Sequence, residues 1–298
     1  MKTQQVIFVI GPTAVGKSAY AIDLALEMNG EIVSADSMQV YKGLDLGTAK
    51  PTHEERRSVT HHMIDICDPK DDYTAAEYSR AAQDVISDIF VRGKLPVVCG
   101  GSGLYVHSLL YDLDFSGSGG NYKLREQLTL EAETHGAGHL FGKLLELDPT
   151  AADHIHPNNV KRVIRALERA YGDLESDGLR DFSGTFEKKR RYDARIIRLT
   201  MNREELYAKI NRRAGDFFTS GLTGEVRDLL ENGVPREANS MQGIGYKEVV
   251  AFIDGIIDEA EALRLVRQNT RRFAKRQETW FKRYTDAEII VNVAVKSC

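Results

Sequence analysis

The sequence contains little cysteine and no long apolar segment, and both features restrict the kind of protein it can be. Its three cysteines, Cys67, Cys99 and Cys298, form no CxxC pair, so we expect neither a disulfide framework nor a cysteine zinc site. No apolar run approaches the roughly 18 residues of a membrane span, and the first residues lack a signal-peptide core. We therefore expect a cytoplasmic protein that makes no membrane contact, and we expect it to be a monomer.

The basic residues are unevenly distributed, although the net charge of −4 says nothing in favour of nucleic acid. Between Arg264 and Arg283 there are eight lysines and arginines against one acid, Glu278. Such a cluster is compatible with a local site for a polyanion. A solvated helix face has the same composition, so charge alone does not choose between the two.

Apolar runs and helical periodicity alternate along the first third of the chain. The short apolar run at 6–10 predicts a buried strand, and the segments 31–35 and 96–99 predict two further strands. Apolar positions at helical spacing predict helices at 17–28 and 75–91, each followed by a glycine. This alternation predicts an α/β fold, a P-loop NTPase-like parallel sheet flanked by helices.

The composition changes after residue 115, which predicts a second domain. Residues 116–120 read Ser-Gly-Ser-Gly-Gly and predict a flexible break. A helix-rich stretch follows, and the segment 195–199, Arg-Ile-Ile-Arg-Leu, predicts a strand that returns to the first sheet. We therefore predict a P-loop core domain from residues 1–115 plus 195–298, with C-terminal helices, and a mainly helical insertion domain at 116–194.

A phosphate-binding motif follows the first predicted strand and opens the first predicted helix. The motif GxxxxGK[ST] is met by Gly11, Pro12, Thr13, Ala14, Val15, Gly16, Lys17 and Ser18. In this context the backbone N–H groups and the helix N-terminus can surround phosphate oxygens. Lys17 adds a full positive charge, and Ser18 can ligate Mg²⁺. The motif predicts a diphosphate or nucleotide site without identifying a reaction.

A carboxylate stands where a parallel sheet places its ligands. The predicted strand at 96–99 has no terminal acid for magnesium, whereas the strand at 31–35 is followed by Asp36. The carboxyl ends of such strands face the ligand crevice. Asp36 therefore suits a general base or a group linked to magnesium, although a turn-capping role fits the same position.

Six segments together resemble one family. They are GPTAVGKS, ADSMQVYKGLDLGTAKP, GGSGLY, HPNNVKRVIRALE, QGIGYKE and TRRFAKRQETWF. In this order they resemble the tRNA dimethylallyltransferases, also called tRNA isopentenyltransferases, and the resemblance covers nearly the whole chain, from Val6 to Phe281. Eukaryotic relatives carry a Cys/His finger after the last segment, and none follows Phe281 here, so the resemblance is to the bacterial form.

The resemblance implies that the P-loop holds the diphosphate of dimethylallyl diphosphate, with Mg²⁺ and no zinc. The dimethylallyl group would pass to N6 of the adenosine 3′ of the anticodon, and diphosphate would leave. Asp36 would act as the base for the poorly nucleophilic amine. Lys17, Arg213 and the loop amides would stabilise the leaving group, and Ser102 would place a hydroxyl at the crevice where the family more often has threonine.

The resemblance also implies three groups of tRNA contacts and a basic helix. The contacts would come from Asp36, Ser37, Met38, Gln39 and Ser102, from Lys161, Arg162, Val163, Ile164 and Arg165, from Gln242, Gly243, Ile244, Gly245, Tyr246 and Lys247, and from Arg271 and Lys275. The target base must leave its stack, and Arg165 is the candidate to fill the vacated space. Alanine is usual at Gly243, so we expect a looser backbone there without loss of a contact.

Two other functions compete with this interpretation. A small-molecule enzyme, either a prenyltransferase acting on AMP or a metabolite kinase, would explain the P-loop and Asp36 but not the basic helices. An RNA-binding module with a degenerate nucleotide site would explain the basic helices but not the intact Lys17, Ser18 and Asp36.

Overall fold

The computed structural model describes residues 5–113, 115, 122–171 and 182–291. Its contacts divide the chain into two compact units, one formed by Met1–Asp112 with Lys189–Cys298 and the other by Leu113–Lys188. Residues 189–194, which we assigned to the insertion, lie with the core, because they lead into a strand of its sheet. At the other boundary the second unit begins at Leu113, three residues before the predicted start at 116. The predicted glycine-rich break at 116–120 lies outside the described residues.

The first unit contains a six-stranded parallel sheet with the order β3-β2-β4-β1-β5-β6. The strands are β1 (Gln5–Ile10), β2 (Gly30–Ser34), β3 (His61–His62), β4 (Leu95–Gly100), β5 (Asp193–Thr200) and β6 (Glu288–Val291). The predicted α/β class and all four predicted strands are confirmed. The sequence did not reveal β3 and β6, because β3 has two residues and β6 is largely exposed, so neither shows a buried apolar run.

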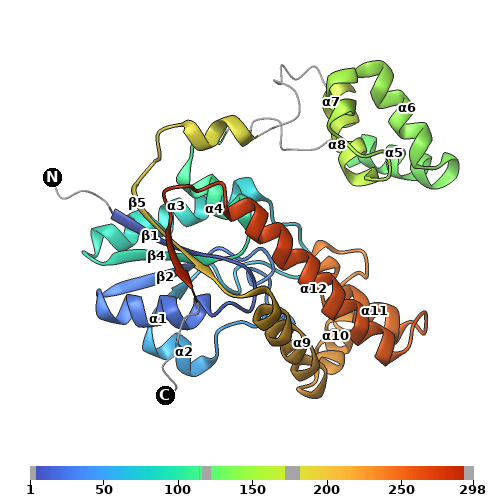
Figure 1. The fold of residues 1–298 in the computed structure, drawn as a ribbon. Coiled ribbons are helices and arrows are strands. Elements are labelled where there is room, and N and C mark those ends of the chain that lie inside the picture. The colour runs from blue at the N-terminus through green and yellow to red at the C-terminus, as the bar shows by residue number, and fades with distance from the viewer. Residues whose placement is uncertain (1–4, 114, 116–121, 172–181, 292–298) are drawn as a thin grey trace. The chain divides into compact units, whose positions relative to one another are not determined.

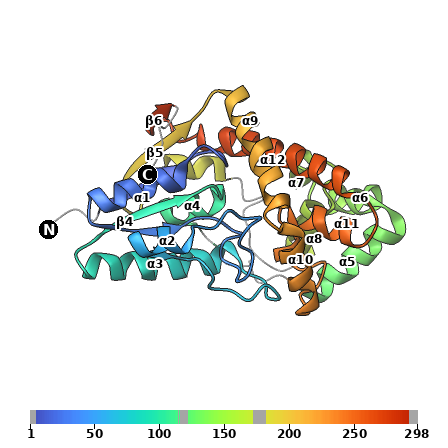
Figure 2. The same ribbon diagram turned by 90° about the horizontal axis from the view of Figure 1, so that it is seen from below.

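Helices cover both faces of this sheet. Figures 1 and 2 show α1 (Lys17–Glu27) and the short α2 (His53–Ser58) on one face, and α3 (Ala75–Val91) with α4 (Gly103–Leu110) on the other. Alternate strand residues point to the two sides, so Ile7 and Val9 of β1 pack in the cluster that includes α1. A capping box at Thr74 begins α3. The sheet is therefore buried on both faces, as parallel sheets require.

The C-terminal part of the first unit is helical. It comprises α9 (Arg203–Thr219), α10 (Leu222–Glu231), the 3₁₀ turn η2 (Asn239–Gln242), α11 (Tyr246–Ile253) and the long α12 (Glu259–Phe281). Figures 1 and 2 show α9 and α12 side by side, with α10 and α11 next to them. Leu206 and Ile210 of α9 and Ala274 of α12 join the core cluster on the α1 face, so both helices are anchored close to the P-loop.

The second unit is helical and has its own core. Its helices are α5 (Tyr122–His135), α6 (Ala137–Leu147), α7 (Pro149–Asp153) and α8 (Val160–Tyr171), followed by the 3₁₀ turn η1 (Phe182–Glu187). Leu140 and Leu144 of α6 pack against Val163 and Leu167 of α8 in one buried cluster. Across the described parts of both units, no helix is long and apolar enough to cross a membrane.

Candidate active site

The P-loop runs from the end of β1 into α1, and its glycines take conformations that other residues avoid. Gly11 has φ 148° and Gly16 has φ 102°, both in the region that glycine tolerates best. A Cβ atom on Gly11 would lie 2.5 Å from the carbonyl oxygen of Leu199 on β5. The ammonium of Lys17 turns back over the loop and donates to the Pro12 carbonyl at 2.8 Å.

A cavity of about 570 Å³ opens beside this loop and brings together residues from distant parts of the sequence. Eight of the residues predicted from sequence line it and so share one space, namely Thr13, Ala14, Gly16, Lys17, Ser18, Asp36, Gln39 and Arg213. The lining also includes five charged or titratable side chains that were not singled out from the sequence, namely Glu55, His61, Lys209, Arg212 and Asp216. Lys209 is four residues from Arg213 on α9, so helical spacing could have indicated that it shares this face.

Burial changes the acidity of the P-loop lysine. Desolvation lowers the pKa of Lys17 from 10.5 to about 8, against the opposing influence of Cys99 and the Asp36 carboxylate and with that of Arg213. Burial also raises the pKa of Cys99 to about 11. A bound diphosphate would oppose this shift, since a nearby anion favours the ammonium.

Asp36 begins the loop after β2, and one of its oxygens is engaged by that loop. Asp36 Oδ1 accepts from the backbone N–H of Met38 at 2.9 Å and of Gln39 at 3.4 Å. Within the described part of the chain, Oδ2 makes no hydrogen bond and is left for another group. Ser102 lies at the start of α4, and its hydroxyl oxygen accepts from the Ser37 N–H at 2.8 Å. Ser102 therefore connects the loop after β4 to the loop that carries Asp36.

Arg213 reaches the P-loop from α9. Its Nη2 donates to the hydroxyl of Thr13, and its guanidinium lies 5.5 Å from the centre of the Phe217 ring. Burial lowers its pKa, an effect opposed by Asp36, but arginine stays protonated at physiological pH. The structure thus places two cations, Lys17 and Arg213, at one loop.

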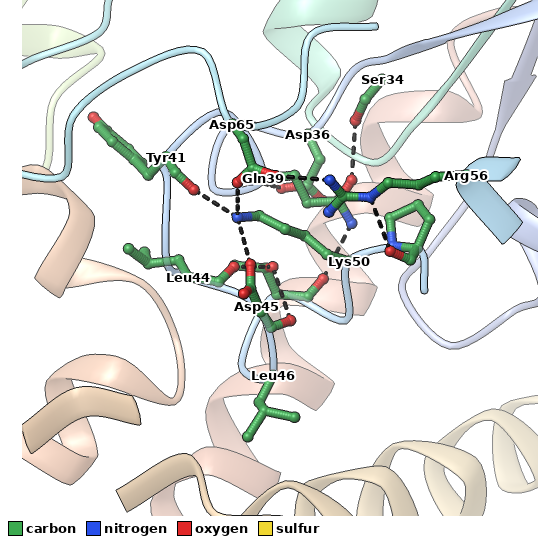
Figure 3. Close-up of polar contacts among 12 residues, drawn as sticks. Ser34, Asp36, Gln39, Tyr41, Leu44, Asp45, Leu46, Lys50, Arg56 and Asp65 are labelled. Atoms are coloured by element: carbon green, nitrogen blue, oxygen red, sulfur yellow. Dashed lines mark hydrogen bonds and ion pairs between the residues drawn. The ribbon is translucent and has the colours of Figure 1, made fainter. Parts of the chain in front are cut away.

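The loop that follows Asp36 is held by a buried lysine that sequence reasoning missed. The side chain of Lys50 is only 2% exposed. Figure 3 shows its ammonium donating to the Tyr41 carbonyl at 2.7 Å, to Asp45 at 2.8 Å and to Asp65. Arg56 donates to the other oxygen of Asp65 at 2.8 Å. These bonds fix a loop segment whose residues 48, 49 and 51 line the cavity.

Gln39 closes the same loop with its side chain. Its Oε1 accepts from the Ser34 hydroxyl at 3.0 Å, and its Nε2 donates to the carbonyls of Thr48 and Ala49 at 3.2 and 3.3 Å. The side chain of Gln39, which we predicted to contact tRNA, is therefore already hydrogen-bonded within the protein.

The predicted segment 242–247 packs against the predicted segment 36–39. A Cβ atom on Gly243 would lie 2.7 Å from the terminal methyl of Met38. An alanine here would require Met38 to shift, so glycine at this position permits close packing. Tyr246 is buried and donates to Glu225 at 2.6 Å, whereas Gln242 and Lys247 are exposed.

In the second unit, the predicted tRNA segment lies on α8 and divides between two faces. Lys161, Arg162 and Arg165 are exposed. Val163 and Ile164 are 0% and 5% exposed and belong to the core of this unit. A ligand on the outside of α8 would thus meet the three cations and not the two apolar side chains.

The basic residues predicted on α12 also differ in their surroundings. Arg271 donates to Asn211 Oδ1 of α9 at 2.6 Å, and its guanidinium lies 6.0 Å from the centre of the Tyr207 ring. Lys275 is exposed and lines a surface hollow of about 230 Å³ with Arg276. Lys275 is therefore better placed than Arg271 to meet a polyanion.

The cavity offers Mg²⁺ a small set of oxygen donors. Ser18 and Asp36 both line it. Mg²⁺ typically takes one or two protein oxygens and completes its shell with substrate phosphates and water, so these residues fit an ion that arrives with a diphosphate. Among the described residues, no group of three or more His, Cys, Asp or Glu side chains could hold a metal by itself.

Known proteins resemble this chain over almost its whole length. Residues 39–284 match the family described as IPP transferase. A tRNA dimethylallyltransferase from Alkaliphilus metalliredigens is 45% identical over 285 residues, which cover 96% of this chain and 91% of the relative. One from Bacillus subtilis is 47% identical over 281 residues, 94% of this chain and 88% of the relative.

Solved structures agree in fold. A full-length tRNA isopentenylpyrophosphate transferase from Bacillus halodurans has a TM-score of 0.71 at 39% identity, covering 97% of this chain and 90% of that one. A eukaryotic dimethylallyltransferase acting on tRNA has a TM-score of 0.77 at 27% identity, covering 98% of this chain and 75% of that one.

Proposed function

The chain belongs to the IPP transferase family, and from this premise we propose how its residues perform a prenyl transfer. It transfers a dimethylallyl group from dimethylallyl diphosphate to N6 of the adenosine 3′-adjacent to the anticodon in tRNA, and it releases diphosphate. The observation that carries the proposal is the shared cavity, which joins a carboxylate with a free oxygen to two cations at a phosphate-binding loop. Acting on tRNA would place the enzyme in the cytoplasm.

Asp36 is the proposed base. The adenosine amine is a weak nucleophile because its lone pair is delocalised into the ring. As its nitrogen bonds to the first carbon of the dimethylallyl group, an N6 proton must leave, and Asp36 Oδ2 is available to take it. The bonds from Met38 and Gln39 to Oδ1 hold the carboxylate in place, so Asp36 needs little reorientation.

The P-loop and α9 stabilise the leaving group in this proposal. As the new C–N bond forms, the C–O bond to diphosphate breaks and the electron pair stays on the diphosphate. Lys17, Arg213 and the loop amides stand where that charge develops. Mg²⁺ would neutralise part of the same charge when bound, with Ser18 among its ligands.

The tRNA contacts are proposed from the exposed groups. On α8 we assign phosphate and base contacts to Lys161, Arg162 and Arg165, and on α12 to Lys275. Ser37, Met38, Gln39 and Ser102 would border the extruded adenosine, since Asp36 and Gln39 line the cavity and Ser102 bonds to the Ser37 N–H. The buried Val163, Ile164 and Tyr246 would support these segments from beneath.

A labelling experiment tests the reaction. The protein is incubated with Mg²⁺ and labelled dimethylallyl diphosphate, and with either bulk tRNA or AMP, beside Asp36→Asn as the control. We expect label in tRNA only, without any need for ATP. Label in AMP would favour a small-molecule prenyltransferase, and ATP hydrolysis coupled to product formation would favour a kinase.

A further inference from the structure

A buried glutamine on α12 joins the P-loop to the loop after β4. Gln277 is 5% exposed and lies among Ala274 and Phe281 on the buried side of the helix. Its Oε1 accepts from the Thr13 N–H at 2.8 Å, and its Nε2 donates to the Gly101 carbonyl at 2.9 Å. One side chain thus bridges two loops that are each distant from it in sequence.

The chemistry of the amide fits this position closely. A backbone N–H needs an acceptor and a carbonyl needs a donor, and glutamine offers one of each at the end of the same side chain. Without it, both backbone groups would lose this hydrogen bond, and because the Gly101 carbonyl is bonded in a buried position, the loss costs free energy. Leucine or methionine would fill the same space but would satisfy neither group.

The bridge continues to the loop that carries Asp36. Ser102 follows Gly101, and it donates its N–H to the Ala35 carbonyl at 3.1 Å. Its hydroxyl oxygen accepts from the Ser37 N–H at 2.8 Å. A continuous chain of hydrogen bonds therefore runs from the P-loop through Gln277 to both neighbours of Asp36.

Gln277 packs closely against the backbone of Gly101. A Cβ atom on Gly101 would lie 2.2 Å from Gln277 Nε2 and 3.7 Å from Lys17 Nζ. Glycine at this position lets the amide approach the loop beside the P-loop lysine. Thr13 is held from a second side, because Arg213 of α9 donates to its hydroxyl. Helix α9, through Arg213, and helix α12, through Gln277, therefore both bind the P-loop at Thr13.

We propose that Gln277 is a positioning residue that fixes the P-loop in its diphosphate-binding shape and sets its distance from the Asp36 loop. The inference rests on the proposed function, and it adds a residue that touches neither substrate. A loop that is already shaped binds its ligand without the entropic cost of ordering it. Correct spacing between the leaving group and the base also favours the reaction itself.

Gln277→Met tests this, because methionine has similar size and keeps neither hydrogen bond. The matched control is Val266→Ala, which removes buried apolar volume from the same helix without touching the P-loop. Dimethylallyl diphosphate affinity is measured by calorimetry without tRNA, and amide hydrogen exchange is followed in peptides that cover residues 11–18 and 100–103.

We expect Gln277→Met to weaken donor binding by roughly tenfold relative to the control, with faster exchange in both peptides and unchanged tRNA affinity. The turnover rate with both substrates saturating should fall as well. Donor affinity and exchange equal to those of Val266→Ala would overturn the proposal. If Gln277→Met does not fold, Gln277→Asn serves instead, because its amide is too short to reach both loops.

Failure of the proposed function would look different. A wild-type protein that transfers no label to tRNA would refute the reaction, whereas the exchange measurement on the P-loop would still test the bridge. An active wild type with an unaffected Gln277→Met would refute only the role of Gln277.

Discussion

Replacing Lys17 by arginine tests whether the P-loop lysine controls how donor binding depends on pH. The pKa of Lys17 is about 8 instead of 10.5, a difference that corresponds to about 3 kcal/mol against the charged form. Protonated Lys17 binds the donor, so affinity is highest below pH 8 and falls as the pH rises through that value. About nine-tenths of Lys17 is protonated at pH 7 and about one-tenth at pH 9, so donor affinity should fall roughly tenfold.

The assay is calorimetric titration of dimethylallyl diphosphate without tRNA or added Mg²⁺, in buffers with different ionisation enthalpies. The phosphate ionisation of the donor, near pH 6, is about nine-tenths complete at pH 7 and nearly complete by pH 8. Burial raises the pKa of Cys99 to about 11 and lowers that of His61, so both shifts move these groups away from the range between pH 7 and 9. We expect binding at pH 9 to take up close to one proton, and binding at pH 7 far less.

Lys17→Arg should abolish both the proton uptake and the fall in affinity, since arginine stays protonated across this range. Lys17→Ala should bind weakly at every pH and leave tRNA affinity unchanged. If the arginine variant kept the uptake of wild type, another group would be its source and the assignment to Lys17 would be wrong.

Three further substitutions test other parts of the site. Asp36→Asn should leave donor and tRNA binding intact and lower the single-turnover rate roughly 10²–10⁴-fold; a rate near that of wild type would exclude Asp36 as the base. Arg165→Ala should lower the rate of the saturated tRNA complex more than tRNA affinity, and it should lower the fluorescence of 2-aminopurine at the target position; if both signals stay at wild-type levels, Arg165 is a surface charge. Lys50→Met should lower the free energy of unfolding, measured in urea, by roughly 2 kcal/mol, because it removes charged hydrogen bonds from a buried position. The control Lys42→Met, at an exposed position in the same loop, should change this free energy little. Equal effects of the two substitutions would show that Lys50 does not stabilise the loop.

The sequence by itself determined the elements whose signals are local. The strands at 6–10, 31–35, 96–99 and 195–199 were predictable because each contains consecutive apolar residues, which the structure buries. The P-loop was predictable because the glycines that allow its backbone conformation and the side chains of Lys17 and Ser18 all lie within eight consecutive residues. The position of Asp36 at the cavity followed from a general property of parallel sheets, that the carboxyl ends of strands face the ligand.

Only the tertiary structure decided which side chains support these groups. Gln277 lies 264 residues from the Thr13 amide that it accepts from, and no local pattern relates the two. Lys50 is buried by a loop that folds back on itself, although lysine is usually exposed. Val163 and Ile164 sit beside exposed cations in the sequence, but the helix turns them into the core. Such partners depend on how helices pack, and packing is a property of the whole chain, whereas periodicity and motifs depend on a few neighbouring residues.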